Sequence, residues 1–152
     1  MLCADRECGM CPMRRKTVLL ISNTTQSFWV YRRDLIRHFI AQGCIVHCVA
    51  ADDSCRDQVR ALGVTLYTIP LHRSSTNPLR ELKTLLTLWW VIYRLRPDVV
   101  FTYTIKPNAY APVFCCLRRI PCISIVTGLG YSFISNTVKA RISRLVFTIG
   151  LS

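Results

Sequence analysis

Five short apolar runs recur along the chain, and segments with helical spacing or helix-capping residues separate them. The runs are five or six residues long and are rich in β-branched and other apolar side chains. The first of them, residues 17–22, is typical of a strand that is buried on both faces of a parallel sheet. We therefore expect strands at residues 17–22, 45–50, 64–69, 98–102 and 122–126.

Helical patterns fill the intervals between these runs. Apolar residues at steps of three and four, closed by Gly43, predict the first helix, and its inward face would carry Phe28, Tyr31, Leu35 and Phe39. Asn77 and Pro78 begin the longest helix as cap and first-turn residue. We expect helices at residues 27–42, 54–62, 78–94, 108–117 and 137–149. Strands that alternate with helices form right-handed βαβ units, so the sequence predicts an α/β fold: a Rossmann-like, doubly wound parallel sheet with helices on both faces.

Length and charge narrow the class of protein further. The 152 residues suffice for one domain, and a hydrophobic content of 51% excludes disorder of the whole chain. Twenty Lys and Arg against eight Asp and Glu give a net charge of +12, which favours nucleic acid, acidic lipid headgroups or phosphate-bearing substrates as partners. Most aromatic residues lie within the apolar patterns, which argues against nucleic acid. The longest uncharged apolar run, residues 84–93, is far shorter than the roughly 18 residues that span a bilayer.

The first fifteen residues differ from the rest of the chain and contain Cys3, Cys8 and Cys11. We interpret residues 1–15 as a disordered leader. A zinc site is the alternative, but no further Cys or His follows at the spacing of a zinc finger, so we expect no metal. The start is not a secretory signal, so we expect the reducing cytoplasm and free thiols. Five other cysteines are predicted to be small core residues: Cys44, Cys48, Cys115, Cys116 and Cys122.

The segments that lead into the expected strands are short, whereas the segments that leave them are longer and polar. In a parallel sheet all strand-exit segments meet at the carboxyl edge, which is where open α/β sheets bind ligands. We therefore expect the functional site along that edge, formed by residues 22–26, 52–53, 72–76, 103–106 and 127–130.

Four candidate binding residues follow from this placement. Arg32, early in the first helix, could hold a phosphate through its guanidinium; Lys106 could do so as a point charge, or be an ordinary surface lysine. His72 is the histidine best placed for hydrogen bonding or proton transfer. Gly128 either lets the backbone approach a ligand closely or forms a tight turn. The sequence has neither the dinucleotide nor the P-loop glycine motif, so we expect no cofactor, and we assign no catalytic residue.

Several strings resemble those of a known enzyme family. The two most specific in combination are Thr-Tyr-Thr-Ile-Lys-Pro-Asn at residues 102–108 and Thr-Gly-Leu-Gly-Tyr at residues 127–131. Together with weaker strings they are similar to the amino-terminal domain of family-4 glycosyltransferases of the GT-B fold, and among these to bacterial enzymes that build capsule, O-antigen or lipid-linked glycans. The weaker strings lie at residues 22–32, 61–64, 69–74, 77–79 and 96–100.

The resemblance implies that residues 16–152 form the acceptor-side half of a two-domain enzyme whose active site lies between the domains. We expect the carboxyl-terminal donor domain to be absent from this chain, which would then be a fragment or one subunit of a split transferase with a separate donor-domain chain. The residues that the resemblance places along the cleft are Arg32, Lys106, Asn108, Thr127 and Gly128.

The implied reaction is hexosyl transfer from a nucleotide sugar, bound as a substrate, to a lipid-linked saccharide in bacterial polysaccharide or glycan synthesis. The chain would be cytoplasmic and peripheral on the inner face of the cell membrane, where its charge favours an anionic surface. Trp89 and Trp90 either contribute to that contact or pack against the sheet. Two alternatives stay open: a non-catalytic subunit that recruits a separate catalytic partner to the membrane, and a basic nucleic-acid-binding module.

Overall fold

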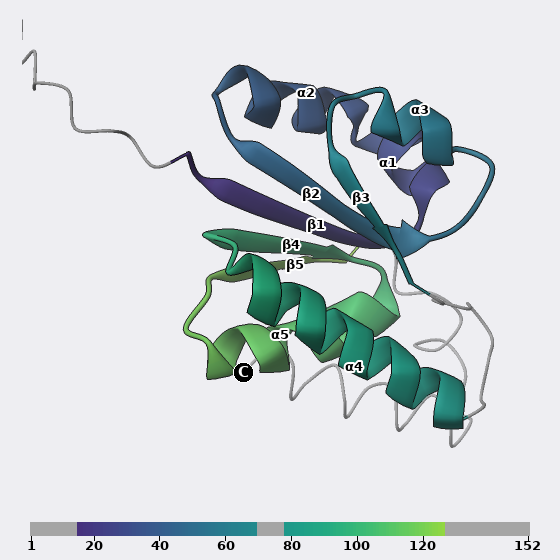
Figure 1. Ribbon diagram of the computed structural model, residues 1–152, viewed down its shortest axis with the longest axis vertical. Helices are drawn as coiled ribbons and strands as arrows, with labels where there is room; N and C mark the ends of the chain where they lie inside the picture. Colours follow the sequence, from purple (N-terminus) through teal and green to yellow (C-terminus); the bar gives the residue numbers. More distant parts are fainter. Residues whose placement is uncertain (1–14, 70–77, 127–152) are drawn as a thin grey trace, which may run out of the picture.

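A five-stranded parallel sheet forms the middle layer of the protein, whose computed structural model describes residues 15–69 and 78–126 (Figure 1). The strands lie in the order β3-β2-β1-β4-β5, and every neighbouring pair is parallel. Their bounds are Thr17–Thr24 (β1), Ile45–Ala51 (β2), Thr65–Thr68 (β3), Val99–Tyr103 (β4) and Cys122–Ile125 (β5). All five expected strands are present, and the predicted α/β class is confirmed.

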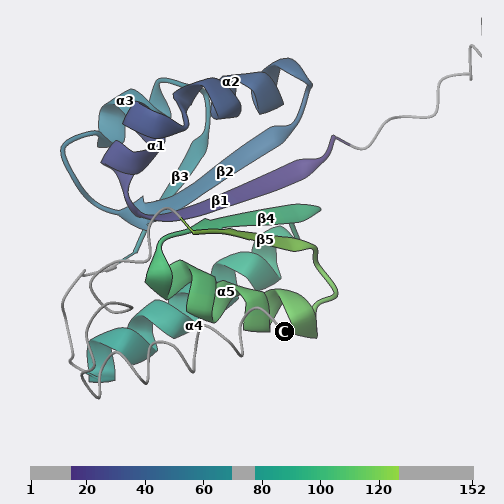
Figure 2. The same cartoon turned by 180° about the vertical axis from the view of Figure 1, so that it is seen from behind.

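Helices cover both faces of this sheet, as the doubly wound fold requires. The helices α1 (Thr25–Tyr31), α2 (Arg33–Ala41) and α3 (Arg56–Arg60) pack on one face, and α4 (Pro78–Leu95) and α5 (Ile105–Leu117) on the other (Figures 1 and 2). The connection from β3 to β4 therefore changes faces, and β4 returns to the central strand β1. The carboxyl ends of β1 and β4 thus form the switch point of the sheet, where open α/β folds bind ligands.

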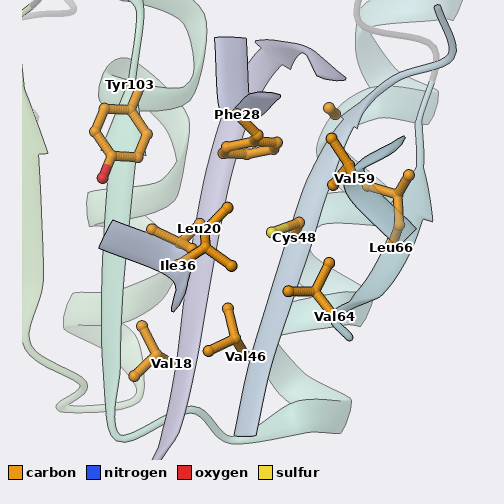
Figure 3. Close-up of a cluster of buried hydrophobic side chains, with 11 residues drawn as sticks. Val18, Leu20, Phe28, Ile36, Val46, Cys48, Val59, Val64, Leu66 and Tyr103 are labelled. Carbon is orange, nitrogen blue, oxygen red and sulfur yellow. The ribbon is translucent and has the colours of Figure 1, made fainter. Parts of the chain in front are cut away.

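The central strand β1 carries the core on both of its faces. Residues 18–21 are between 0% and 2% exposed. Val18 and Leu20 belong to the cluster under α1–α3, together with Phe28, Cys48 and Tyr103 (Figure 3). Leu19 and Ile21 belong to the second cluster, which packs against Leu88 and Ile92 of α4. A strand buried in this way needs apolar side chains at every position, which is why its sequence shows an unbroken apolar run.

The predicted helix over residues 27–42 is wrong in one respect: it is two helices, because the backbone breaks at Arg32. Arg32 ends α1 and begins α2 with φ −131° and ψ 8°. The break rotates the apolar face, so that Phe28 and Ile36 are buried while Tyr31, predicted to face the core, is 79% exposed. The side chain of Arg32 explains the break, since it turns inward against β4.

Two smaller expectations also need correction. The fourth helix begins at Ile105 instead of residue 108, because Thr104 has φ 76° and turns the chain directly from β4 into α5. Cys116 is exposed, whereas Cys48 and Cys115 are buried as predicted. For Trp89 and Trp90 the sequence left open a membrane contact or packing against the sheet; both side chains are exposed, Trp90 to 52%. The expected leader, residues 1–15, and the expected helix at 137–149 lie, apart from Arg15, outside the described residues.

We predict that the Leu20→Ala variant loses about 2–5 kcal/mol of unfolding free energy, because Leu20 is fully buried at the centre of the sheet and its truncation leaves a cavity. Urea denaturation followed by circular dichroism measures the loss. The Leu86→Ala control, at an exposed helix position, should change the free energy by no more than about 0.5 kcal/mol. Equal losses in the two variants would contradict this account of the core.

Candidate functional site

Buried polar atoms without hydrogen-bond partners gather at the carboxyl ends of β1 and β4. Within the described ranges, these include Ser22 Oγ, Asn23 Oδ1, Thr104 Oγ1 and Asn108 Oδ1. A buried polar atom that makes no hydrogen bond costs about 1–3 kcal/mol, so a cluster of them at one place needs an explanation. The hydroxyl groups of a sugar would donate to the two amide oxygens, and sugar or phosphate oxygens would accept from the protein hydroxyls. The switch point is therefore the candidate site.

Arg32 forms the floor of this site on the side of α1. Its guanidinium carbon lies 3.8 Å from the centre of the Tyr103 ring, and Nη1 donates to the Ser27 carbonyl at 3.0 Å and to Ser27 Oγ at 2.5 Å. The residue is only 8% exposed. Burial lowers the pKa of Arg32, and the nearby Tyr103 opposes that shift. Burial also raises the pKa of Tyr103, while the charge of Arg32 acts in the opposite direction.

Asp53, from the loop after β2, fixes the start of α1. Its Oδ2 accepts from the backbone N–H of Thr25 at 2.8 Å and of Gln26 at 3.3 Å, and Oδ1 accepts from the Thr25 hydroxyl and from the Cys55 N–H. A carboxylate at this position stabilises the exposed N–H groups and the positive end of the helix dipole. The neighbouring Asp52 forms an ion pair with Arg56 at 2.9 Å. Both rim carboxylates of the described chain are thus engaged in structure.

Thr104 connects β4 to α5 in an unusual backbone conformation. Its φ of 76° and ψ of 160° fall in a region that is populated almost only by glycine. Strain of this type costs about 1–3 kcal/mol and concentrates at functional sites. The turn places Lys106 in the first turn of α5 and Thr104 Oγ1 among the unpartnered atoms of the rim.

Asn108 links the rim to the end of β5. Its side chain is 1% exposed, and Nδ2 donates to the carbonyl oxygen of Ile125 at 3.1 Å. Nearby, Thr102 in β4 donates its hydroxyl to Ser124 in β5 at 3.0 Å. These contacts fix the position from which the chain continues toward Thr127 and Gly128.

The structure thus places three of the predicted site residues, Arg32, Lys106 and Asn108, near the carboxyl ends of β1 and β4. Arg32 and Lys106 belong to helices on opposite faces of the sheet, so their convergence on one ligand stays a prediction. His72, Thr127 and Gly128 lie outside the described residues. Sequence reasoning did not single out Ser22, Asn23, Tyr103 or Thr104. All four lie in the strand-exit segments, but only their burial distinguishes them.

A hollow of about 750 Å³ also exists at the opposite, amino edge of the sheet. It lies between the turn that follows α2 and the start of β4. Arg15, Lys16, Phe39 and Val99 are among its lining residues. None of the unpartnered buried atoms of the described residues belongs to this lining, so it lacks the feature that distinguishes the carboxyl edge.

A parallel sheet in this order, with helices on both faces and polar groups at the switch point, is a Rossmann-like, doubly wound domain. Residues 17–152 match the family described as glycosyl transferase 4-like, and the chain belongs to that family. The family resemblance of the sequence is confirmed.

Relatives and solved structures agree with this assignment. The chain is 25% identical, over 127 residues, to N,N'-diacetylbacillosaminyl-diphospho-undecaprenol alpha-1,3-N-acetylgalactosaminyltransferase of Campylobacter jejuni, covering 83% of this chain and 34% of that protein. A glycosyltransferase structure from Rickettsia africae superposes with a TM-score of 0.58 at 12% identity, covering 83% of this chain and 35% of that one. A structure described as a putative UDP-N-acetylglucosamine 2-epimerase from Listeria monocytogenes superposes with a TM-score of 0.61 at 15% identity. The match covers 91% of this chain and 38% of that one.

The two structural likenesses show the fold alone, since one is to a transferase and the other to an epimerase. The chain spans about a third of the length of these relatives. The activity of the whole proteins is therefore a proposal for this chain.

We predict that Thr104→Gly raises the free energy of unfolding by about 1 kcal/mol, because glycine adopts the backbone conformation of residue 104 without strain. Thr104→Ala is the matched control: it also removes the hydroxyl but keeps a Cβ, so it should give no such gain. Urea denaturation of both variants gives the comparison. A lower stability of the glycine variant than of the alanine variant would show that residue 104 is not strained.

Proposed function

We propose that this chain forms the acceptor-side half of a glycosyltransferase that transfers a hexose from a nucleotide sugar to a lipid-linked saccharide. The observation that carries the proposal is the gathering of buried, unpartnered hydroxyl and amide groups at the switch point of a family-4 fold. Neutral groups of this kind suit the hydroxyls of a saccharide, and the cations near the same edge suit the phosphates that link a saccharide to a lipid.

The name of the Campylobacter relative supports the choice of acceptor. That enzyme is described as transferring N-acetylgalactosamine to a saccharide on diphospho-undecaprenol. A diphosphate on a lipid carrier is an anionic group held at a membrane, and the net charge of +12 on this chain favours such a partner. We further propose that the protein works at the inner face of the cell membrane, peripheral to it, as part of bacterial glycan synthesis.

Catalysis in this proposal requires a donor-binding domain, either in a longer form of this protein or on a separate chain. The described rim supplies groups that bind, and its two carboxylates, Asp52 and Asp53, are already engaged by Arg56 and by the start of α1. The role of this half is then to hold and orient the acceptor, which lowers the entropic part of the barrier to transfer.

We predict that the 152-residue chain alone transfers no sugar. The measurement is incubation with radiolabelled nucleotide sugars and a short-chain prenyl-diphosphate saccharide, followed by extraction of the lipid-linked product. Turnover by the isolated chain would contradict the need for a donor domain.

We predict that Lys106→Ala weakens binding of the same prenyl-diphosphate saccharide about ten- to hundredfold. A charge-assisted contact to phosphate is worth about 1.5–3 kcal/mol, which corresponds to that range in Kd. Isothermal titration calorimetry with the 152-residue chain measures the affinity. Lys16→Ala, which removes the same charge from the amino edge of the sheet, should leave it within about twofold. Equal effects of the two variants would show that Lys106 acts only through net charge.

A further inference from the structure

The outward face of α4 is apolar along its whole length. Six exposed side chains lie on it: Leu79, Leu82, Leu86, Trp89, Trp90 and Tyr93. They recur at steps of three and four residues, so they form one stripe, which we call the outer stripe. The opposite face of α4, with Leu88, Val91 and Ile92, is buried against the sheet. A helix that is apolar on both faces is usually covered on both.

Aromatic stacking gives one end of the outer stripe a fixed shape. The rings of Trp89 and Tyr93 stack with their centres 5.4 Å apart and an angle of 27° between their planes. The guanidinium carbon of Arg118, from the end of α5, lies 4.4 Å from the centre of the Tyr93 ring. The stripe thus continues directly into a group of cations.

Those cations line a pocket of about 350 Å³ at the ends of α4 and α5, which we call the arginine pocket. Its walls are Arg96, Leu117, Arg118, Arg119 and Ile120. Leu117 is 74% exposed, so an apolar side chain stands at the mouth of this basic pocket.

Two of these arginines occupy backbone positions that favour glycine. Arg96 has φ 45° and Arg119 has φ 53°. The turn that ends α2 has glycine at this position: Gly43 has a positive φ, and the N–H of the next residue, Cys44, donates to the Phe39 carbonyl. The turn that ends α5 has the same hydrogen bond, from the N–H of Ile120 to the Cys115 carbonyl, but Arg119 stands where α2 has glycine. Glycine adopts a positive φ with less strain than arginine does. The presence of arginine at both positions therefore indicates that the arginine side chains have a role of their own.

The charge on this side of the protein is mostly positive. Residues 78–121, which include α4, β4 and α5, contain seven Lys and Arg against two acidic residues, whereas residues 25–60, which include α1, α2 and α3, contain five against four. On the other face of the sheet, α2 and α3 carry Asp34 and Asp57 among their basic residues. The surface around the outer stripe is therefore the more strongly positive one.

We infer that the outer stripe and the arginine pocket together dock the protein on an anionic membrane, with the leucines and aromatic rings in the headgroup region and the arginines on lipid phosphates. An apolar stripe with Trp and Tyr beside Lys and Arg is the composition that membrane interfaces favour. In the described part of the chain, no helix is long and apolar enough to cross a bilayer, so docking here is contact along the surface.

Charge complementarity selects the membrane over a second copy of the chain. Two copies that met through this face would bring two basic surfaces together, each with Lys83, Arg94 and the arginine pocket, and each copy carries +12. Repulsion of that kind opposes a dimer, whereas acidic lipid headgroups neutralise it.

The direction of α4 connects this surface with the candidate site. The helix begins at the carboxyl edge and ends at the arginine pocket, about 27 Å away at 1.5 Å per residue. A membrane along the stripe would then run past the rim where a lipid-linked acceptor is proposed to bind. The inference adds the docking surface to the proposed function and rests on it only for the choice of acceptor.

The test uses the 152-residue chain and two kinds of vesicle, one of phosphatidylcholine alone and one that also contains phosphatidylglycerol. We expect the protein to sediment with the anionic vesicles at low salt and much less with the neutral ones. High salt should release most of it, because screening shortens the range of the attraction. No sugar is needed, so this result is independent of acceptor binding.

Two variants with matched controls locate the contact. Arg119→Gly should weaken vesicle binding about fivefold, while its melting temperature stays the same or rises. Arg60→Ala, which removes one charge from α3 on the opposite face, should have a much smaller effect. Leu86→Gln should weaken binding about tenfold or more, whereas Val30→Gln, at an exposed position of α1, should not.

Three results would overturn the inference. The first is equal sedimentation with neutral and anionic vesicles. The second is equal loss of binding in the variants and in their opposite-face controls. The third is that the chain does not bind vesicles but forms a dimer in analytical ultracentrifugation, and that the Leu86→Gln substitution dissociates this dimer. The outer stripe would then be an interface between copies.

Discussion

The stacking of Arg32 on Tyr103 joins the first βα unit to the fourth strand. Arg32 is also the residue at which α1 ends and α2 begins. The guanidinium reaches across the top of the sheet from α1 to β4 and also bonds the Ser27 carbonyl and hydroxyl. A cation buried to this degree needs compensation, which the ring face and the two oxygens supply. The demand is strong enough to divide one amphipathic segment into two helices and to turn Ile36, in place of Tyr31, toward the core.

The amino-acid sequence predicts the layers of this fold well. The central strand β1 is buried on both faces and must be apolar over residues 18–21, and the edge strands β3 and β5 keep short apolar runs although parts of them are exposed. The five runs correspond to five strands, and the contrast between short and long connections identified the edge that carries the unpartnered polar atoms. Helix boundaries were less predictable. The break at Arg32 depends on Tyr103, which is distant in sequence, and the early start of α5 depends on a backbone conformation of Thr104 that threonine rarely adopts.

The individual site residues were predictable only in part, for the same reason. Arg32, Lys106 and Asn108 could be chosen by charge or by resemblance. Ser22, Asn23 and Thr104 carry no sequence signal of their own, since serine, asparagine and threonine are ordinary in exposed turns. What distinguishes them is burial without a partner, and that is a property of the packed molecule. The exposed face of α4 is a comparable case: its apolar spacing was visible, but the sequence could not show which of its two apolar faces the sheet would cover.

The contacts of Asp53 have a consequence for how the candidate site moves. One carboxylate joins the first turn of α1, which follows β1 directly, to the loop after β2, through the backbone of Thr25, Gln26 and Cys55. We therefore expect these two segments to move together. A ligand that arrives at this side of the rim meets groups that are already in place and loses little freedom in ordering them. In a complete enzyme, other segments would then move to close around the substrates. They would close against the start of α1 and the loop after β2, which keep their positions.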